Sequence, residues 1–388
     1  MMHYLDVPII LMLITLGVLG ACASSGITNR YIIKFEPPEG SRFGCIDGLR
    51  GYLALFVAIY HYYIFYDWFN GKEWGHPKIS LINNIGVGSV HIFFMITAYL
   101  FIKKINKPSV NWKELYVSRL FRICPLYYLA VVITFVYAYM IGGDTLIGRE
   151  NIKDIIKWLM FNGYYIGEFK AGIITAGVTW TLRYEWLFYL LLPILFFIIR
   201  SRTFKVLVLC LFLYLLSTEF EKIGFTAVNF TGFFIGAAVA LFEVKIKETI
   251  GVVSKRIQNI IFVLAILASV CINVENYLDL VYLQCACGVI FVLVIAGNDF
   301  FGLLSKKTSI ILGEISYSIY LMHGIVIYTV FYVLDLFRYI TSFTEYALII
   351  PFVMFIVVVV SSITFTFIEK PMIYFGKEIN NRYVKRLM

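Results

Sequence analysis

The stretch Ile349-Ile-Pro-Phe-Val-Met-Phe-Ile-Val-Val-Val-Val-Ser361 decides the fold class, because it carries no charge and no polar residue at alternate positions. Strands of a membrane barrel alternate apolar and polar residues with period two, so an unbroken apolar run favours a helix. With its flanks the run extends over 346–368, and about 20 apolar residues are enough to cross a bilayer. The stretch therefore predicts a transmembrane helix.

The composition extends this prediction to the whole chain. Of the 388 residues, 61% are hydrophobic and only 15% are charged, whereas soluble domains have about 25% charged residues. A soluble protein of this size could not bury so much apolar surface. We expect an all-α fold, a polytopic membrane helix bundle of about 11 transmembrane helices, at 7–24, 48–66, 84–102, 123–141, 181–199, 204–218, 225–243, 258–273, 279–296, 310–333 and 346–368.

The distribution of basic residues predicts the topology. The net charge is +9, and most Lys and Arg residues fall in every second loop between the apolar segments. This alternation follows the positive-inside rule rather than forming one basic surface for nucleic acid. We expect a multi-pass protein of the bacterial inner (plasma) membrane, surrounded by lipid, with its N-terminus outside and its C-terminus cytoplasmic. No nucleic-acid partner is expected.

The longest predicted outer loop, 141–180, contains a short amphipathic pattern. Its apolar residues recur at helical spacing: Ile152, Ile155, Ile156 and Leu159. This spacing predicts a short helix that lies on the outer membrane surface.

Charged and titratable residues inside predicted spans are candidates for function, since they are costly in lipid. Arg50 and His61 lie in the second span, eleven residues apart. Eleven residues make about three helical turns and about 16 Å, so both side chains face the same way, with His61 near the bilayer centre. The structural alternative is a histidine satisfied by a backbone carbonyl, together with an arginine that reaches the membrane surface.

Two further arginines, Arg119 and Arg122, are three residues apart and share a helical face. They fall on the predicted cytoplasmic side, as Arg50 does. Three guanidinium groups suit a polyanionic ligand, because each offers a rigid fork of donors to phosphate. The alternative is that they serve only as a positive-inside signal.

Glu185 and His323 complete the candidate set. Glu185 lies near the outer end of its span and is either a structural ion-pair partner or part of an acceptor site. His323 lies about 13 residues into its span, at a depth similar to that of His61. Helix packing could bring the two histidines together, which the sequence alone cannot show. His91 is interpreted as structural, and we expect no metal site.

Known catalytic motifs of other classes do not occur: there is no G-x-S-x-G elbow, P-loop, H-E-x-x-H pair or dinucleotide-binding turn. A histidine base that activates an acceptor hydroxyl is the simplest chemistry for this set of residues. The alternative is a transporter or a flippase of a lipid-linked sugar, which would use the same charges along a substrate path.

The ordered motifs of the chain resemble the acyltransferase-3 family of integral-membrane O-acyltransferases. The matching pieces are Asp47-Gly-Leu-Arg50-Gly with His61, Phe93-Phe94, Arg119-x-x-Arg122 with Pro125-Leu-Tyr-Tyr, Trp180-Thr-Leu-x-x-Glu185, Ser316-Tyr-Ser-Ile-Tyr-Leu-x-His323, and Glu369-Lys-Pro371. The resemblance implies a ten-helix domain that moves an acyl group, usually acetyl, from cytoplasmic acetyl-CoA to a carbohydrate hydroxyl. The family's functional core falls here on Arg50, His61, Arg119 and Arg122.

The chain also departs from the family pattern. The span 7–24 precedes the family domain, Thr97-Ala98-Tyr99 stands where Ser-Gly-Phe is usual, and Arg183 replaces a small residue. We expect an extra N-terminal transmembrane helix and cytoplasmic linker at 1–44, an acyltransferase-3-like domain at 45–375, and a cytoplasmic tail at 376–388.

The sequence therefore predicts an acetyl-CoA-dependent O-acetyltransferase. Arg50, Arg119 and Arg122 would bind the acyl-CoA, and His61 would act as base, with Glu185 and His323 as further catalytic candidates. The acceptor class stays open among O-antigen, exopolysaccharide and other glycans, as do the acyl group and the oligomeric state. Some aromatic residues are expected either to stack on sugar rings or to form interfacial belts: Trp68, Trp74, Tyr164, Tyr165 and Trp180.

Overall fold

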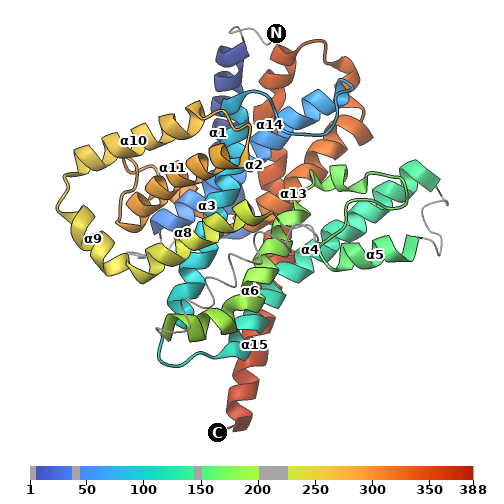
Figure 1. The fold of residues 1–388 in the computed structure, drawn as a ribbon. Coiled ribbons are helices and arrows are strands. Elements are labelled where there is room, and N and C mark those ends of the chain that lie inside the picture. The colour runs from blue at the N-terminus through green and yellow to red at the C-terminus, as the bar shows by residue number, and fades with distance from the viewer. Residues whose placement is uncertain (1–5, 37–43, 144–150, 201–225, 388) are drawn as a thin grey trace. The chain divides into compact units, whose positions relative to one another are not determined.

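The computed structural model describes residues 6–36, 44–143, 151–200 and 226–387. Within these ranges the chain is helical and contains no β-strand (Figure 1), which confirms the predicted all-α class. The chain divides into two compact units. The first unit comprises Met1–Lys78, Trp112–Trp180 and Leu304–Met388, and the second comprises Ile79–Asn111 and Thr181–Leu303.

Several helices are long and apolar enough to cross a membrane. Among the described residues there are seven, or up to eight if one bent pair counts as a span: Val7–Ile33, Ser80–Ile105, Trp112–Gly142, Thr179–Arg200, Tyr277–Ile295, Ser316–Val333 and Phe343–Asn381, with Ala227–Leu241 plus Glu243–Gly251 as the bent pair. The predicted span 204–218 lies outside the described residues. The polytopic bundle is confirmed, while the count of eleven stays a prediction.

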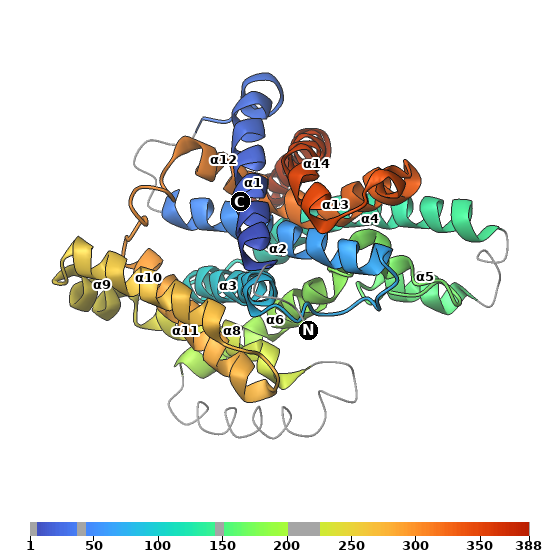
Figure 2. The ribbon, with the colours of Figure 1, turned by 90° about the horizontal axis from the view of Figure 1, so that it is seen from above.

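The first unit consists of helices from both ends of the chain and from its middle. Its α-helices are α1 (Asp6–Thr28), α2 (Gly44–Phe69), α4 (Trp112–Gly142), α5 (Ile152–Leu159), α12 (Lys307–Glu314), α13 (Ser316–Tyr328), α14 (Phe343–Thr364) and α15 (Lys370–Leu387). Helix α1 lies alongside α14 (Figures 1 and 2), and α2 packs against α12, α13 and α1.

Helix α2 is the central element of the first unit. Most of its residues between Ile46 and Phe65 are buried. Its mean hydropathy is too low for it to count among the candidate membrane spans. Tyrosines, His61 and charged residues lower the mean hydropathy of this helix. Since other helices cover α2, its polar residues need protein partners rather than lipid-compatible side chains.

Glycines allow close approach where the site helices meet. A Cβ added at Gly51 of α2 would lie 2.8 Å from both the backbone nitrogen of Gly313 and the Cβ of Leu312 on α12. A Cβ added at Gly324 of α13 would lie 2.5 Å from the backbone nitrogen of Ala176. Small residues at these positions let backbones pack directly, as membrane helices commonly do.

The same device fixes α1 on α14. A Cβ at Gly20 would lie 2.6 Å from the carbonyl oxygen of Pro351, and one at Gly17 would lie 3.1 Å from side-chain atoms of Ile350 and Ile59. The first helix is therefore closely docked on the first unit.

The C-terminal helices form a continuous helical stretch. A π-helical turn, Phe365–Glu369, joins α14 to α15. Pro371 lies two residues after this turn, inside the continuous stretch, and supplies no N–H to the helical hydrogen-bond ladder. Helix α15 packs on α4, with the rings of Phe121 and Phe375 5.4 Å apart.

The predicted amphipathic helix is confirmed as α5. Its apolar residues Ile152, Ile156 and Leu159 are exposed, while Trp158 is fully buried. The Trp158 Nε1–H donates to the carbonyl oxygen of Tyr165 at 3.1 Å, so one face of α5 is anchored by the segment that follows it.

The second unit contains α3 (Ser80–Ile105), α6 (Thr179–Arg200), α8 (Phe230–Leu241), α9 (Glu243–Gly251), α10 (Lys255–Cys271) and α11 (Tyr277–Ile295). Helix α8 packs closely on α3. The predicted span 225–243 corresponds to the helical segment Ala227–Leu241, and α9, which follows it directly, is bent from it by 75°. The bend falls where Glu243 pairs with Lys103 of α3 at 2.7 Å, so a charged residue marks the end of the apolar helix.

Candidate active site

The structure brings together the two histidines that the sequence placed at similar depth. Nδ1 of His61, on α2, lies 3.0 Å from Nε2 of His323, on α13. The centroids of the two rings are 5.0 Å apart. His323 is fully buried, whereas His61 is half-buried. The pair therefore has one protected ring and one ring that substrate can reach.

Backbone carbonyls determine which ring nitrogens carry hydrogen in the pair. Nδ1 of His323 lies 3.0 Å from the carbonyl oxygen of Ile319, and Nδ1 of His61 lies 3.0 Å from that of Val57. A carbonyl oxygen only accepts, so both Nδ1 atoms carry the hydrogen in neutral rings. The single Nδ1–H of His61 is then shared between the Val57 carbonyl oxygen and Nε2 of His323, and Nε2 of His61 keeps a lone pair.

A second polar cluster contains Arg50, further toward the start of α2. Its Nη1 lies 3.4 Å from Oδ1 of Asp47, and Arg122, Glu314 and Glu369 are close enough to interact with it electrostatically. The separation from Asp47 exceeds the ~2.7–2.9 Å of a tight charge-assisted hydrogen bond. An anion that makes shorter bonds could therefore compete for this guanidinium.

Glu369 connects the arginine cluster to the histidine helix. It is fully buried, its Oε2 accepts from the Ser318 hydroxyl at 2.8 Å, and its Oε1 lies 3.9 Å from Nη2 of Arg122. Oε1 itself has no hydrogen-bond partner among the described residues. A buried carboxylate needs a cation nearby, and Arg122 provides one.

The two clusters thus share the same pair of helices. Helix α2 carries Arg50 and His61, and α13 carries Ser318 and His323. The eleven residues between Arg50 and His61 correspond to about 16 Å along a helix. The structure therefore arranges a cationic region and an imidazole region in succession along α2.

The remaining candidates belong to different units: Arg119 to the first, and Glu185 and His91 to the second. Arg119 lies one turn before Arg122 on α4 and is half-buried. Glu185 belongs to the second unit, where the Tyr189 hydroxyl donates to its Oε1. His91 is buried in the second unit, and Gln284 Nε2 lies 3.2 Å from its ring nitrogens, in accordance with the structural interpretation of this histidine.

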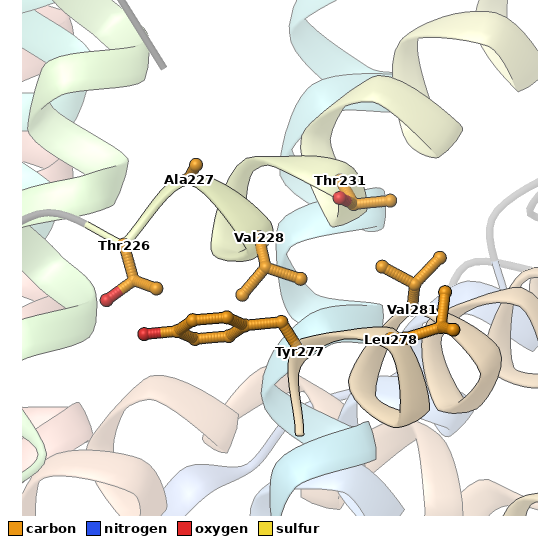
Figure 3. Close-up of a pocket in the computed structure, with 7 residues that line it drawn as sticks. All are labelled: Thr226, Ala227, Val228, Thr231, Tyr277, Leu278 and Val281. Carbon is orange, nitrogen blue, oxygen red and sulfur yellow. The ribbon is translucent and has the colours of Figure 1, made fainter. Parts of the chain in front are cut away.

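A separate pocket in the second unit contains none of the predicted site residues. It has a volume of about 420 Å³ and lies between the start of α8 and the start of α11 (Figure 3). Its lining is aliphatic with a few hydroxyl groups: Thr226, Ala227, Val228, Thr231, Tyr277, Leu278 and Val281. It offers no imidazole, carboxylate or guanidinium group for acid–base chemistry.

Comparison with known families bears directly on this site. A family model described as an acyltransferase domain, that of the acyltransferase-3 family, matches residues 43–368. The chain belongs to this family. Comparisons with curated proteins and with solved structures find no match. With its apolar helices, this acyltransferase is a multi-pass membrane enzyme.

The family match includes every predicted site residue of this acyltransferase, but their individual roles stay predictions. The match also leaves α1 and all of α15 outside its limits, and the proposed domain boundaries stay predictions too. Glu369 lies one residue beyond the matched range. Sequence reasoning quoted it only within the Glu369-Lys-Pro371 motif, although a carboxylate at the end of an apolar span was a usable signal.

Sequence reasoning missed the surroundings of His61. Tyr60 Oη and Nδ1 of His76 are 2.8 Å apart, and the rings of Tyr60 and His61 are 4.8 Å apart. His76 belongs to a loop after α2, and its sequence gives no sign that the loop returns to the site. Trp74 of the same loop was one of five aromatic residues considered for stacking on sugar rings, and nothing in the sequence favoured it over the other four.

Proposed function

We propose that this acyltransferase transfers an acyl group, most simply acetyl, from cytoplasmic acyl-CoA to a hydroxyl of a cell-surface or lipid-linked carbohydrate. The observation that carries the proposal is the hydrogen-bonded pair of His61 and His323, in which Nε2 of His61 has a lone pair for proton abstraction. A histidine base suits this reaction at neutral pH.

The arginine cluster is the proposed donor site. Arg50 and Arg122 have carboxylate partners at 3.4 and 3.9 Å, distances that leave room for shorter bonds to phosphate. Arg119 lies on the same helical stretch as Arg122 and is assigned to the same ligand. The alternating basic loops support a cytoplasmic position for this cluster in the inner membrane.

In the proposed reaction, Nε2 of His61 takes the proton of the acceptor hydroxyl as its oxygen attacks the thioester carbonyl. The new C–O ester bond forms, the C–S bond breaks, and the proton passes from His61 to the departing CoA sulfur. No other reactant is needed, and the imidazole returns to its starting state.

His323 is proposed as the positioning residue of the base. Its Nε2 accepts the His61 N–H, and its own Nδ1–H is held by the Ile319 carbonyl. This arrangement selects the His61 tautomer with a basic Nε2. It also stabilises the cation that forms when Nε2 takes the proton, much as an acceptor behind a catalytic histidine does in other enzymes.

The test uses purified protein in lipid nanodiscs with radiolabelled acetyl-CoA. The acceptor is the surface glycan of the producing cell, freed of its O-esters by mild alkali. His61→Ala should lower transfer about 10²–10⁴-fold, the usual contribution of a general base. His91→Gln is the matched control, a buried histidine of the second unit that should retain transfer.

His323→Gln and His323→Ala separate positioning from packing. Glutamine can still accept the His61 N–H through its side-chain oxygen, so it should retain more kcat than alanine does, with a similar KM for acetyl-CoA. Normal transfer by His61→Ala would reject the base assignment. Movement of a lipid-linked sugar without consumption of acyl-CoA would instead favour the transporter alternative.

A further inference from the structure

The loop after α2 folds back over the reactive histidine. The indole ring of Trp74 and the imidazole ring of His61 are nearly parallel, with 12° between their planes and 6.4 Å between their centroids. Both side chains are half-buried. Trp74 is therefore at the accessible side of the histidine pair, since His323 on its other side is fully buried.

The position of Trp74 is fixed by contacts on both sides of it. Before it, the Lys72 ammonium pairs with Asp67 at 2.6 Å. After it, His76 is hydrogen-bonded to Tyr60 of α2 at 2.8 Å. The indole itself packs edge-on against Phe65, with 5.0 Å between ring centroids. The loop thus holds the indole beside His61 in a defined orientation.

A second aromatic ring approaches from a different segment. Gly177 follows the short 3₁₀ turn Ala171–Thr175 and has a φ of +69°. A Cβ added there would lie 3.8 Å from both Nε1 of Trp74 and Cε2 of Tyr164. The two rings therefore flank one glycine, and both lie within van der Waals contact of a Cβ placed at position 177.

The other tryptophans named as sugar-stacking candidates have different surroundings. Trp68 stacks on Tyr328 and is tilted against Tyr332, with ring centroids 6.1 and 6.0 Å away, and it meets Trp74 edge-on at 6.3 Å. No ring contact between Trp68 and His61 occurs among the described residues, whereas Trp74 has one. The geometry thus distinguishes Trp74 from an interfacial belt residue.

We propose that Trp74, with Tyr164 across Gly177, forms the stacking platform for the acceptor's sugar ring and directs one of its hydroxyls to Nε2 of His61. The inference rests on the proposed function and assigns its acceptor subsite. One face of a pyranose ring is lined by C–H groups with slight positive charge, which suit the negative face of an indole. The ligand class is therefore a pyranose-containing glycan, rather than a linear alcohol.

The test compares kinetic constants for the two substrates in nanodiscs. The acceptor is again the producing cell's surface glycan after mild alkaline de-esterification, and the donor is radiolabelled acetyl-CoA. Trp74→Ala should raise the KM for the glycan about 10-fold, and Trp74→Phe should raise it less. Hydrolysis of acetyl-CoA without acceptor should stay within about 2-fold of the parent. Trp112→Ala, a half-buried tryptophan at the start of α4, is the matched control.

Two outcomes separate this proposal from the proposed function. An unchanged glycan KM in Trp74→Ala, with acetyl-CoA hydrolysis intact, overturns the platform while leaving the acyltransferase reaction standing. Absence of acetyl-CoA turnover in the parent protein overturns the proposed function itself.

A binding measurement covers the case in which Trp74→Ala does not fold. The parent protein carries 5-fluorotryptophan, and Trp74→Phe assigns the Trp74 fluorine resonance. Addition of the de-esterified glycan should shift that resonance, and sorbitol at equal hexose concentration should not. The proposed platform is rejected if the glycan does not shift the Trp74 fluorine resonance, or if sorbitol shifts it equally.

Discussion

Replacing Arg122 by glutamine should lower the folding stability of this acyltransferase, in addition to weakening its binding of the acyl donor. The change removes the cation 3.9 Å from Oε1 of Glu369, whose side chain is 0% exposed. At an effective dielectric constant of about 20, two unit charges at this distance attract by about 4 kcal/mol. Arg122 is 27% exposed, and the buried carboxyl can take up a proton once its cation is gone, so solvent screening and protonation lower the expected loss to about 1–2 kcal/mol.

The partner variant should behave differently. Glu369→Gln leaves a guanidinium that is partly exposed and can be hydrated, so we expect a cost of only about 1 kcal/mol. In the double variant Arg122→Gln/Glu369→Gln no buried charge is left without a partner. Its stability should therefore recover most of what Arg122→Gln loses, with a coupling energy of about 1–2 kcal/mol.

The assay is reversible unfolding of the four proteins in mixed micelles as the mole fraction of SDS rises, followed by tryptophan fluorescence. Binding of acetyl-CoA is measured on the same preparations by equilibrium dialysis. The stable double variant should still bind acetyl-CoA weakly, because it lacks one guanidinium of the donor site. The reasoning is refuted if the stability losses of the two single variants simply add in the double variant, or if Arg122→Gln is as stable as the parent protein. Either result would show that the ion pair between Arg122 and Glu369 does not stabilise the fold.

Two further predictions concern packing and pH. Gly51→Ala places a Cβ 2.8 Å from the neighbouring helix and should cost about 1–3 kcal/mol, seen as a lower thermal midpoint. Gly26→Ala, with nothing within 4 Å of its added Cβ, is the control and should not lower the midpoint, because alanine favours a helix over glycine by about 1 kcal/mol. The hydrogen bond from Lys157, together with the Gly167 N–H, lowers the pKa of Asp154 below its ordinary value. The bond from the Gly167 N–H to the Asp154 carboxylate is therefore present above about pH 4 and is lost as pH falls through the lowered pKa. Amide-exchange protection at Gly167 should fall in acid. Asp154→Ala, which has no acceptor, should show low protection already at neutral pH, and equal protection in both proteins at neutral pH would contradict the assignment.

Much of the helical pattern was predictable because lipid imposes simple rules. Long apolar runs such as 346–368 became helices, and the amphipathic spacing at 151–161 gave α5. The prediction of span boundaries was less accurate where a helix is interrupted within an apolar stretch. The expected span 310–333 is two helices, α12 and α13, separated at Ile315, and hydropathy does not reveal such a break.

The candidate site was predictable in its residues but not in its contacts. The depths of His61 and His323 followed from counting residues along each span. Their hydrogen bond depends on how closely α2 packs on its neighbours. Gly51 of α2 and Gly313 of α12 allow the close approach of these two helices, and the sequence does not tell which backbone each glycine will face. Packing between distant segments is a property of shape, and a pattern along one chain does not contain it.

Glu369 and Trp74 show two further limits of sequence reasoning. Glu369 looked like the polar end of a span, and only the fold places its carboxylate between Ser318 and Arg122. Trp74 was one aromatic residue among several near predicted membrane boundaries. Its position beside His61 depends on the return path of a short loop, which local propensities do not determine.

The glycine contacts of α1 have a consequence for protein engineering. An ordinary signal-anchor rich in leucine would cross the bilayer equally well, but it would carry bulky side chains where Gly20 meets Pro351. Such a chimaera should reach the membrane and yet fail to seat against α14. Helix α1 thus has a surface that fits α14 specifically. Exchanging it for a generic transmembrane helix should lower the acyltransferase activity but leave membrane localisation unchanged.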